Sequence, residues 1–363
     1  MSTLGKLDPY LEDTGPAALV LRDELMPVEG ADGVLFPPTY ASGDDFAGGY
    51  NIDDGPNGQN ICLVDSVGAQ ANRIEPMFLK PPYAALVPQI GVQAGDRVVS
   101  LLEAGHRAGD ALVRCSALQD ELQSAFKAMQ KGDSAPLAKI APTSLVFGVW
   151  DSRDTQAKAP RLLASTIRAY NVRRLTRSAQ YVPATDYVGQ ELLAEPPDKS
   201  TKDSYSVRGF IHVPATATHG GVIASGGIRR DATLSLAALR LLSAGSDADR
   251  TRALRRYVLG LAVTAFTTNV SGYLRQGCNL VCDASKPRRI EAVYPWGERK
   301  PFTMTHEEAL AYAVDTARAF GVGESRLVEF DKERAKRDAA GDPDKKAKAK
   351  KADAKKPEAK APR

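Results

Sequence analysis

The sequence is poor in the residues that bind metals or form disulfides, with four cysteines and four histidines among 363 residues. Only Cys278 and Cys282 lie close together, and the three residues between them exceed the two-residue gap typical of zinc knuckles and thioredoxin-like sites. The histidines complete no metal-binding spacing. We therefore expect no metal site, and cysteines that are reduced and either buried or incidental.

Long apolar segments are absent as well. VLGLAVTAF, residues 258–266, is one of the longer apolar runs, and it is less than half the length of a membrane-spanning helix. The first residues, MSTLGKLDPYLED, lack the basic and then apolar pattern of a signal peptide. With 43% hydrophobic and 25% charged residues the composition is that of a soluble globular protein, so we predict a cytoplasmic location and no membrane contact.

The motifs of several common enzyme families are missing too. No G-x-S-x-G, Walker A or H-E-x-x-H pattern occurs, and GGVIASGG at 220–227 lacks the spacing of a dinucleotide fingerprint. The carboxylate pairs at 44–45 and 53–54 lie in turn-like contexts, where aspartate favours local hydrogen bonds over acid–base catalysis. We therefore predict a protein that is not an enzyme and that uses no cofactor.

Positive charge is concentrated at the C-terminal end. The net formal charge is +4, but residues 331–363 contain 13 Lys or Arg and 7 Asp or Glu, hence +6, which leaves −2 for residues 1–330. The terminal segment has almost no large apolar residue with which to offset its ordering entropy. We predict one domain over 1–330 and a disordered tail over 331–363, beginning at about Lys332, which is either simply solvated or helps to attract polyanions.

Apolar periodicity predicts a mixed chain. We expect strands at 17–22, 144–150, 205–213 and 279–283, and helices at 63–79, 109–133, 231–243, 249–266 and about 306–320. HGGVIASGGIRR at 219–230 is expected to be a glycine-rich link, and MTHEE opens the last helix with a pattern like a capping box. The predicted fold class is α+β, poor in strands, with long irregular insertions of the kind that are usually functional.

A strongly basic stretch, WDSRDTQAKAPRLLASTIRAYNVRRLTRSAQY at 150–181, stands out within the domain. Guanidinium groups match phosphate geometry and aromatic rings stack on unpaired bases, so this pattern favours a track for single-stranded nucleic acid. The alternative is a solvated charged surface. The stretch holds seven cations, two carboxylates and three aromatic residues: Arg153, Lys158, Arg161, Arg168, Arg173, Arg174 and Arg177; Asp151 and Asp154; Trp150, Tyr170 and Tyr181.

A second basic cluster, Arg229 and Arg230, follows Gly226 and Gly227. If the glycine turn leads into a helix that begins at Asp231 or Thr233, its backbone N–H groups form an anion site. The alternative is a plain turn with exposed arginines.

Four segments together resemble one protein family. They are ICLVDSVGAQANRIEPMF at 61–78, FGVWDSR at 147–153, RLLASTIRAYNV at 161–172 and GGIRRDATLSLAALRLL at 226–242. In this order they resemble the backbone subunit of the type I-U (also called I-G) CRISPR surveillance complex, a member of the RAMP superfamily. The resemblance extends over roughly residues 15–320 and omits the basic tail.

The resemblance implies both a fold and a function. The fold is a ferredoxin-like, RRM-like palm with large insertions called fingers and thumb, for which the segments 30–60 and 189–204 are thumb candidates. Copies of such a subunit assemble head to tail along a guide RNA, together with other subunits of the complex, and leave the bases free to pair with a target DNA strand. Cutting belongs to a separate helicase-nuclease, which agrees with a protein that is not an enzyme.

The same resemblance suggests which residues contact RNA. Asn72 and Arg73 are polar on an otherwise apolar helix, and their alternative role is a core hydrogen bond or ion pair with Glu75 or Asp65. The full set comprises Ser66, Gln70, Asn72, Arg73, Ser152, Arg153, Lys158, Arg161, Arg168, Arg174, Gly227, Arg229 and Arg230.

Two alternatives from other functional classes stay open. One is a metal-dependent ribonuclease of the same superfamily that acts through Asp151, Asp154 or Asp53. The other is an adaptor that forms oligomers without nucleic acid. Because an acidic remainder of the body could meet a basic cluster of the next copy, head-to-tail contacts between unlike surfaces are a further expectation.

Overall fold

A computed structural model describes residues 3–269 and 271–340, and a sheet of eight strands forms its centre. The strands follow the order β16-β15-β1-β13-β10-β5-β4, with β14 paired to the end of β1, and all these pairings are antiparallel. Their bounds are Ala18–Pro27 (β1), Ile52–Asp54 (β4), Asn60–Asp65 (β5), Leu163–Tyr170 (β10), Ile228–Ser235 (β13), Leu280–Cys282 (β14), Arg289–Val293 (β15) and Arg299–Pro301 (β16).

The two faces of this sheet differ in burial. In β1 the buried residues Leu19, Leu21 and Leu25 alternate with half-buried residues such as Arg22, because successive side chains of a strand point to opposite faces. Most of β13 alternates in the same way. One face is therefore packed against the rest of the protein, and the other, here called the open face, is partly exposed to solvent.

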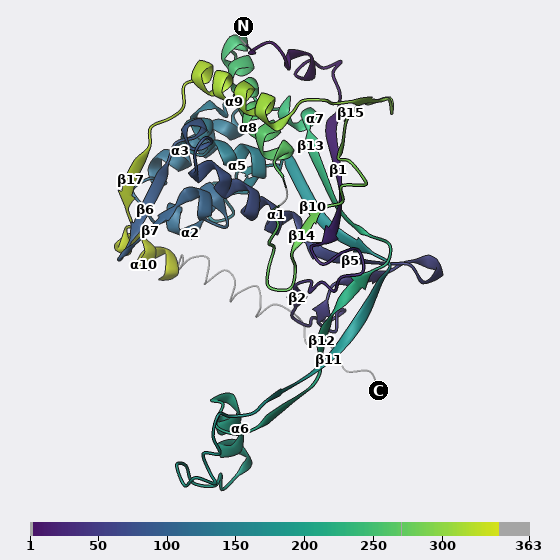
Figure 1. Ribbon diagram of the computed structural model, residues 1–363. Helices are drawn as coiled ribbons and strands as arrows, with labels where there is room; N and C mark the ends of the chain where they lie inside the picture. Colours follow the sequence, from purple (N-terminus) through teal and green to yellow (C-terminus); the bar gives the residue numbers. More distant parts are fainter. Residues whose placement is uncertain (1–2, 270, 341–363) are drawn as a thin grey trace, which may run out of the picture.

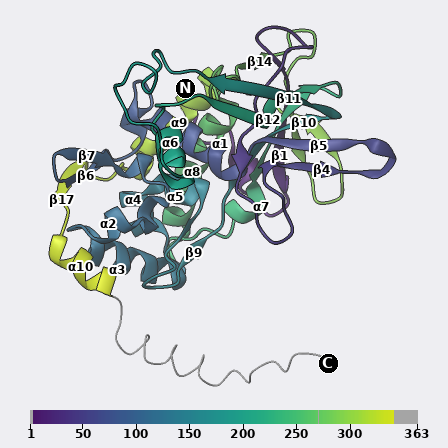
Figure 2. The same ribbon diagram turned by 90° about the horizontal axis from the view of Figure 1, so that it is seen from below.

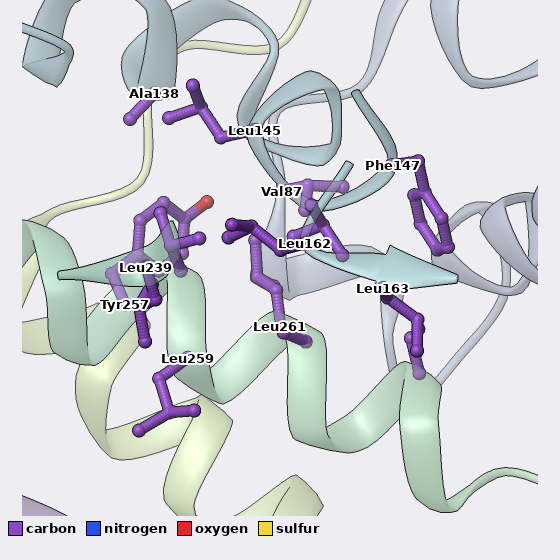
Figure 3. Close-up of a cluster of buried hydrophobic side chains, with 14 of the residues drawn as sticks. Val87, Ala138, Leu145, Phe147, Leu162, Leu163, Leu239, Tyr257, Leu259 and Leu261 are labelled. Atoms are coloured by element: carbon purple, nitrogen blue, oxygen red, sulfur yellow. The ribbon is translucent and has the colours of Figure 1, made fainter. Parts of the chain in front are cut away.

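Three helices cover the packed face. α1 (Val67–Ile74) and α5 (Pro142–Phe147) contact β10, and α8 (Ala248–Thr267) contacts β13. Figure 3 shows Leu162 and Leu163 close to side chains of α5 and α8 such as Phe147 and Leu261. The second half of α8 is buried on all sides, because α9 (His306–Phe320) packs against it as well.

Further helices and a small sheet lie on the side away from the large sheet (Figure 1, Figure 2). They are α2 (Ala111–Arg114), α3 (Gln119–Gln130), α4 (Ala135–Ile140), β6 (Ile90–Ala94), β7 (Arg97–Ser100) and β17 (Arg326–Glu329). β17 pairs in parallel with β6, and the chain then forms α10 (Lys332–Ala340), in which Asp338 makes an ion pair with Arg114 of α2.

A long hairpin arm projects from the body of the molecule (Figure 1). It consists of β11 (Val172–Tyr181) paired with β12 (Val213–Ala224), and the connection between them contains α6 (Lys199–Val207). Aromatic rings pack together at its tip, with ring centroids 5.2 Å apart for Tyr187 and Phe210 and 6.0 Å apart for Tyr205 and Phe210.

Short elements complete the structure. Two small pairs of strands and the one-turn helix α7 connect the larger units: Thr39–Tyr40 (β2) with Gly49–Tyr50 (β3), Val149–Trp150 (β8) with Lys158–Ala159 (β9), and Leu236–Leu239 (α7). Single turns of 3-10 helix lie at Asp8–Tyr10, Pro56–Gly58, Glu75–Leu79, Ala84–Leu86, Leu101–Glu103 and Arg107–Gly109. Within the described ranges, no helix has the length and apolarity needed to cross a membrane.

Much of the predicted secondary structure is confirmed, as is the α+β class. α9 has the predicted bounds and a complete capping box, in which Thr305 Oγ1 accepts from the Glu308 backbone and the Glu308 carboxylate accepts from the Thr305 backbone. The helix predicted over 63–79 forms only in part, because residues 63–65 belong to β5. α1 begins after Ser66, whose Oγ accepts from the Ala69 N–H at 3.2 Å. The strands predicted at 17–22 and 279–283 and the helix at 249–266 also form.

Two of the predicted elements before the basic stretch are wrong in detail. The helix predicted over 109–133 is interrupted between α2 and α3, because the Ser116 hydroxyl bonds to the backbone of Val113 and Leu118 in place of a helical ladder. The strand predicted over 144–150 is helical up to Phe147. Pro142 favours a helix start there, and Gly148, at φ 82°, ends the helix before the short strand β8.

The region from 205 to 243 also differs from the prediction. The alternating segment 205–213 is mostly helix α6 and a turn, because Asp198 caps α6 by accepting from the Thr201 N–H at 2.7 Å. The predicted link at 219–230 and the predicted helix over 231–243 instead contain parts of β12 and β13, and only α7 is helical. The chain is therefore richer in strands than we expected. Long-range pairing has overridden local pattern here.

The predicted disorder of the tail is wrong for its first part, since Lys332–Ala340 forms α10. Ion pairs from Arg334 to Asp120 and from Asp338 to Arg114 attach this helix to the body. Residues 341–363, the rest of the predicted tail, lie outside the described residues.

The close contact between α8 and α9 gives a stability prediction. A Cβ added at Gly260 would lie 2.5 Å from Thr316 Oγ1 and 2.9 Å from Ala313 Cα. We expect Gly260→Ala to lower the free energy of unfolding, because overpacking costs about 1–3 kcal/mol and the higher helix propensity of alanine returns at most about 1 kcal/mol. Denaturant unfolding measures the change. Gly68→Ala in α1 is the matched control, since its Cβ meets no atom closer than 3.9 Å; an equal loss in both variants would contradict the prediction.

Candidate nucleic-acid interface

The predicted contact residues fall into three surface regions and one buried network. The surface regions are a basic pocket beside β8 and β9, the open face of the large sheet, and the root of the arm. The buried network lies between α1 and the packed face of the sheet.

The basic pocket is a cavity of about 650 Å³. Four of the predicted residues line it together, namely Ser152, Arg153, Lys158 and Arg161. Arg107 and Arg114, which are distant in sequence, contribute to the rest of the wall, and no Asp or Glu is among its lining residues. A cavity with cations on several sides and no lining carboxylate favours a polyanionic ligand.

An aromatic ring accompanies these cations. Trp150 lines the pocket and its side chain is unusually exposed for tryptophan, with 57% of the residue accessible to solvent. The ammonium group of Lys158 lies 5.6 Å from the centre of the Trp150 ring. The pocket therefore combines a flat stacking surface with cations, as single-strand binding proteins do.

Arg107 forms the buried wall of the pocket. Its Nε donates to Glu75 Oε2 at 2.6 Å, its Nη2 donates to Asn72 Oδ1 at 3.5 Å, and its guanidinium lies 5.4 Å from the Phe147 ring centre. Burial raises the pKa of Glu75 to about 7, although Arg107 acts in the opposite direction. Asn72 is exposed and supports Arg107 through this weak hydrogen bond, so it is not enclosed in the core and does not pair with Glu75 or Asp65 as the alternative suggested.

The loop between β8 and β9 is held by its aspartates. Asp151 is buried, and its carboxylate accepts hydrogen bonds from Thr155 N at 2.8 Å and Thr155 Oγ1 at 2.6 Å. Asp154 accepts from Gln119 Nε2 at 2.5 Å. These contacts give both residues a structural role in positioning Arg153 and Lys158. Asp53, the third candidate for RNA cleavage, lies exposed on β4. In the described part of the chain, no group of three His, Cys, Asp or Glu residues is arranged to hold a metal ion.

The open face of the sheet carries Arg168 of β10 and Arg229 of β13, which are register partners. Arg229 Nη2 donates to the Tyr170 hydroxyl at 2.7 Å, its Nε donates to Asp231 at 2.8 Å, and its guanidinium lies 4.7 Å from the Tyr170 ring centre. Arg168 donates to Thr166 Oγ1 at 2.7 Å. This face is therefore basic but partly neutralised by Asp231.

The predicted helix after Arg230 does not form, so the prediction of an anion site at its N-terminus is wrong. Asp231 and Thr233 lie on β13. Gly227 has φ 84° and belongs to the tight turn between β12 and β13, where its carbonyl accepts from the Tyr170 N–H at 2.9 Å. The positive φ explains why glycine occupies this position.

Arg174 lies exposed at the root of the arm, on β11 beside Arg173. Arg177 follows on the same strand, 6.0 Å from the ring centre of Phe36. The basic stretch of the sequence is thus divided between the pocket, the open face and the arm.

Of the remaining predicted residues, Arg230 and Gln70 are buried, whereas Arg73 is exposed and Ser66 half-buried. Arg230 is 1% exposed and pairs with Asp23, so it is not a surface contact as we expected. Arg73 pairs with Asp65 at 3.1 Å, which is the alternative that the sequence left open, and Gln70 also donates to Asp65 at 2.7 Å. Ser66 caps α1.

Sequence reasoning missed the second wall of the pocket. Arg107 and Arg114 lie on short helices, and no cluster of charged residues surrounds them in the sequence. They line the same pocket as Lys158 only because of the tertiary structure. Arg22 of β1, on the open face, could have been found from the alternation of apolar and polar residues in AALVLRDE.

Comparison with known families agrees with the resemblance in part. Residues 19–174 match the family described as CRISPR-associated protein GSU0053 (Cas_GSU0053). The match shows a CRISPR-associated protein, and it includes α1, the basic pocket and the start of the arm. No curated protein matches the chain.

The buried carboxyl below the pocket gives a pH prediction. The folded-state pKa of Glu75, about 7, lies above its usual value of 4.5. Its contribution to stability is therefore fully present below about pH 4.5 and is lost as the pH rises through about 7, because the folded state holds the proton more tightly. Glu75→Gln removes this dependence. We expect the free energy of unfolding of the wild type minus that of the variant to fall between these pH values in denaturant titrations. A difference that rises with pH over the same interval would contradict the assignment.

Proposed function

We propose that this chain, CRISPR-associated by its match over residues 19–174, is a backbone subunit that binds guide RNA without catalysis. Copies assemble head to tail along the guide and present its bases to a target DNA strand, together with other subunits and a separate helicase-nuclease. The observation that carries this proposal is the basic pocket, where Arg153, Lys158 and Arg161 surround a cavity beside the exposed Trp150.

The topology of the sheet supports an RRM-like palm. Four of its strands, taken in chain order, are β1, β10, β13 and β15, and they lie in the spatial order fourth, first, third, second. α1 lies between the first and second of these strands in the chain, and α8 lies between the third and fourth. This order matches the βαββαβ arrangement of ferredoxin-like and RRM domains, and RRM domains bind single-stranded RNA on their four-stranded sheet. The match supports the proposal of an RRM-like palm.

The chemistry of the pocket suits RNA whatever its sequence. Phosphates carry the same charge at every nucleotide, and every base has a face that can stack. Contacts of lysine and arginine with phosphates, and stacking of a base on Trp150, do not depend on which base is present. Sequence selection is then left to base pairing, as a guide requires.

The arm is our candidate for the thumb. The segment 189–204, one of the two sequence candidates, lies within the connection between β11 and β12, and Leu192 and Val207 near its tip are exposed apolar residues. The other candidate, 30–60, contains the small strands β2 to β4. We propose that the arm contacts the next copy of the chain, because an exposed apolar tip on a projecting hairpin suits a head-to-tail contact.

Bound RNA tests the proposal directly. The full chain is expressed with and without a CRISPR array, together with its neighbouring genes, and the RNA that co-purifies is sequenced. We expect discrete repeat–spacer RNA in a particle of several copies when the array is present. A particle that forms equally well without RNA would support the adaptor alternative, and metal-dependent cleavage of bound RNA would support the ribonuclease alternative.

The aromatic residue of the pocket gives a quantitative prediction. Stacking of one base on an aromatic side chain is worth about 1–3 kcal/mol by alanine substitution, so Trp150→Ala should weaken binding of single-stranded RNA by about 5- to 150-fold. Trp296→Ala is the matched control, because Trp296 is also exposed (63%) but lies outside the pocket. Fluorescence anisotropy with a labelled RNA measures both variants. If both variants lose the same affinity for RNA, or if Trp150→Ala loses none, the pocket does not bind RNA through Trp150.

A further inference from the structure

A network of charged side chains links α1 to the packed face of the sheet. Asp23 of β1 accepts hydrogen bonds from Arg288 at 2.6 and 2.9 Å and from Arg230 at 3.5 Å. Asp65, at the end of β5, accepts from Arg73 at 3.1 Å and from Arg275 at 2.9 Å. Both carboxylates are almost completely buried.

Two neutral side chains join the halves of this network. The Ser165 hydroxyl accepts from Arg230 Nε at 3.1 Å and donates to Gln70 Oε1 at 2.9 Å, and Gln70 Nε2 donates to Asp65 at 2.7 Å. A continuous chain of hydrogen bonds therefore connects the ion pairs around Asp23 with those around Asp65.

The charges of the network do not balance. Its ion pairs bring four guanidinium groups, those of Arg73, Arg230, Arg275 and Arg288, to two carboxylates. Two positive charges stay uncompensated among the described residues that form it. The side chains of Arg73, Arg275 and Arg288 are partly exposed (32%, 24% and 24%), so water screens part of this charge, whereas Arg230 is 1% exposed. For the buried Arg230 an uncompensated charge is costly, because desolvation penalises the ion.

Arg230 also has an unused donor. Its Nε and Nη1 bond to Ser165 and to Asp23 and the Thr268 carbonyl, but its Nη2, which is buried, has no hydrogen-bond partner in the described structure. A buried guanidinium N–H without a partner is uncommon in native proteins and calls for an explanation. Burial also lowers the pKa of Arg230, to about 10, so the guanidinium is still charged near neutral pH.

A small cavity lies beside Arg230. Its volume is about 120 Å³, and Arg230, Arg73 and Gln70 contribute to its wall. Thr268, Asn269 and Ser271 add polar groups, and apolar side chains complete the lining. The cavity thus brings together two of the four arginines, several neutral polar groups and no carboxylate in its wall. Arginine forks are well suited to tetrahedral oxyanions.

We propose that this cavity, which lies between α1 and the residues Thr268, Asn269, Ser271 and Leu274, binds one phosphate group, held by Arg73 and the free Nη2 of Arg230. The phosphate supplies the negative charge that the network lacks. Its source is either a phosphodiester of the guide, which rests on the proposed function, or a free phosphate ion. The site is distinct from the basic pocket, because the two share no lining residue.

Thermal unfolding of the full chain, freed of nucleic acid at high salt, tests the site with two probes. Inorganic phosphate should raise Tm by about 2 °C or more in a saturable way, whereas chloride at equal ionic strength should not. The dinucleotide UpU, which has one internal phosphodiester and no terminal phosphate, distinguishes the sources. A shift with both probes assigns a backbone phosphate, and a shift with inorganic phosphate alone assigns a free ion.

Ser271→Glu is the decisive variant, because it places a carboxylate at the cavity wall in the role of the missing anion. We expect a higher Tm without phosphate and loss of the phosphate-dependent shift. Ser42→Glu, an exposed serine in the loop between β2 and β3, is the matched control and should keep the shift. Arg73→Gln should weaken phosphate binding at least tenfold. No saturable shift in the wild type, or an unchanged shift in Ser271→Glu, would overturn the proposal.

Failure of this site and failure of the proposed function give different results. Trp150 lines the other cavity, so Trp150→Ala should weaken RNA binding and keep the phosphate shift. Absence of RNA binding with a normal phosphate shift would count against the guide-binding function alone. RNA binding by the wild type without a phosphate shift would count against the phosphate site alone.

Discussion

The interaction on which the architecture depends most is the enclosure of Arg230 beneath the sheet. This one guanidinium contacts Asp23 of β1, Ser165 of β10 and the backbone that follows α8, while its own backbone belongs to β13. It therefore connects three neighbouring strands with a helix end. Removing one member of a buried ion pair typically costs about 3–5 kcal/mol, so the packed face tolerates little change here. The open face, which contains Arg168 and Arg229, is free of that constraint.

Arginine thus performs two different tasks in one small region. Arg229 and Arg230 are neighbours in sequence, yet alternation along β13 sends one to the open face and the other into the network. The first is partly exposed to solvent and pairs with Asp231, and the second is buried and connects members of the network. A count of basic residues cannot separate these tasks, whereas the strand register does.

The elements that sequence analysis predicted well are those whose signals are local. The capping box at Thr305 and the apolar stripe of α8 depend on residues within a few turns of each other. The errors arose where distant segments decide the outcome. β13 forms because β1 and β10 pair with it on both sides, against the helical pattern of 231–243. Only one wall of the basic pocket was predicted, for the same reason. The cations after Trp150 are clustered in the sequence, but Arg107 and Arg114 come close to them only in the folded protein.

The root of the arm is fixed more firmly than its length suggests. Leu35 exchanges two backbone hydrogen bonds with Val222, and the Tyr50 hydroxyl accepts from the Gly221 N–H at 2.9 Å. The two-stranded ribbon therefore leaves the body in a set direction. In a filament of identical copies, the length of this ribbon would set the distance between the point where one copy begins and the point where it contacts the next. That spacing would depend on the hairpin and not on the identity of any base.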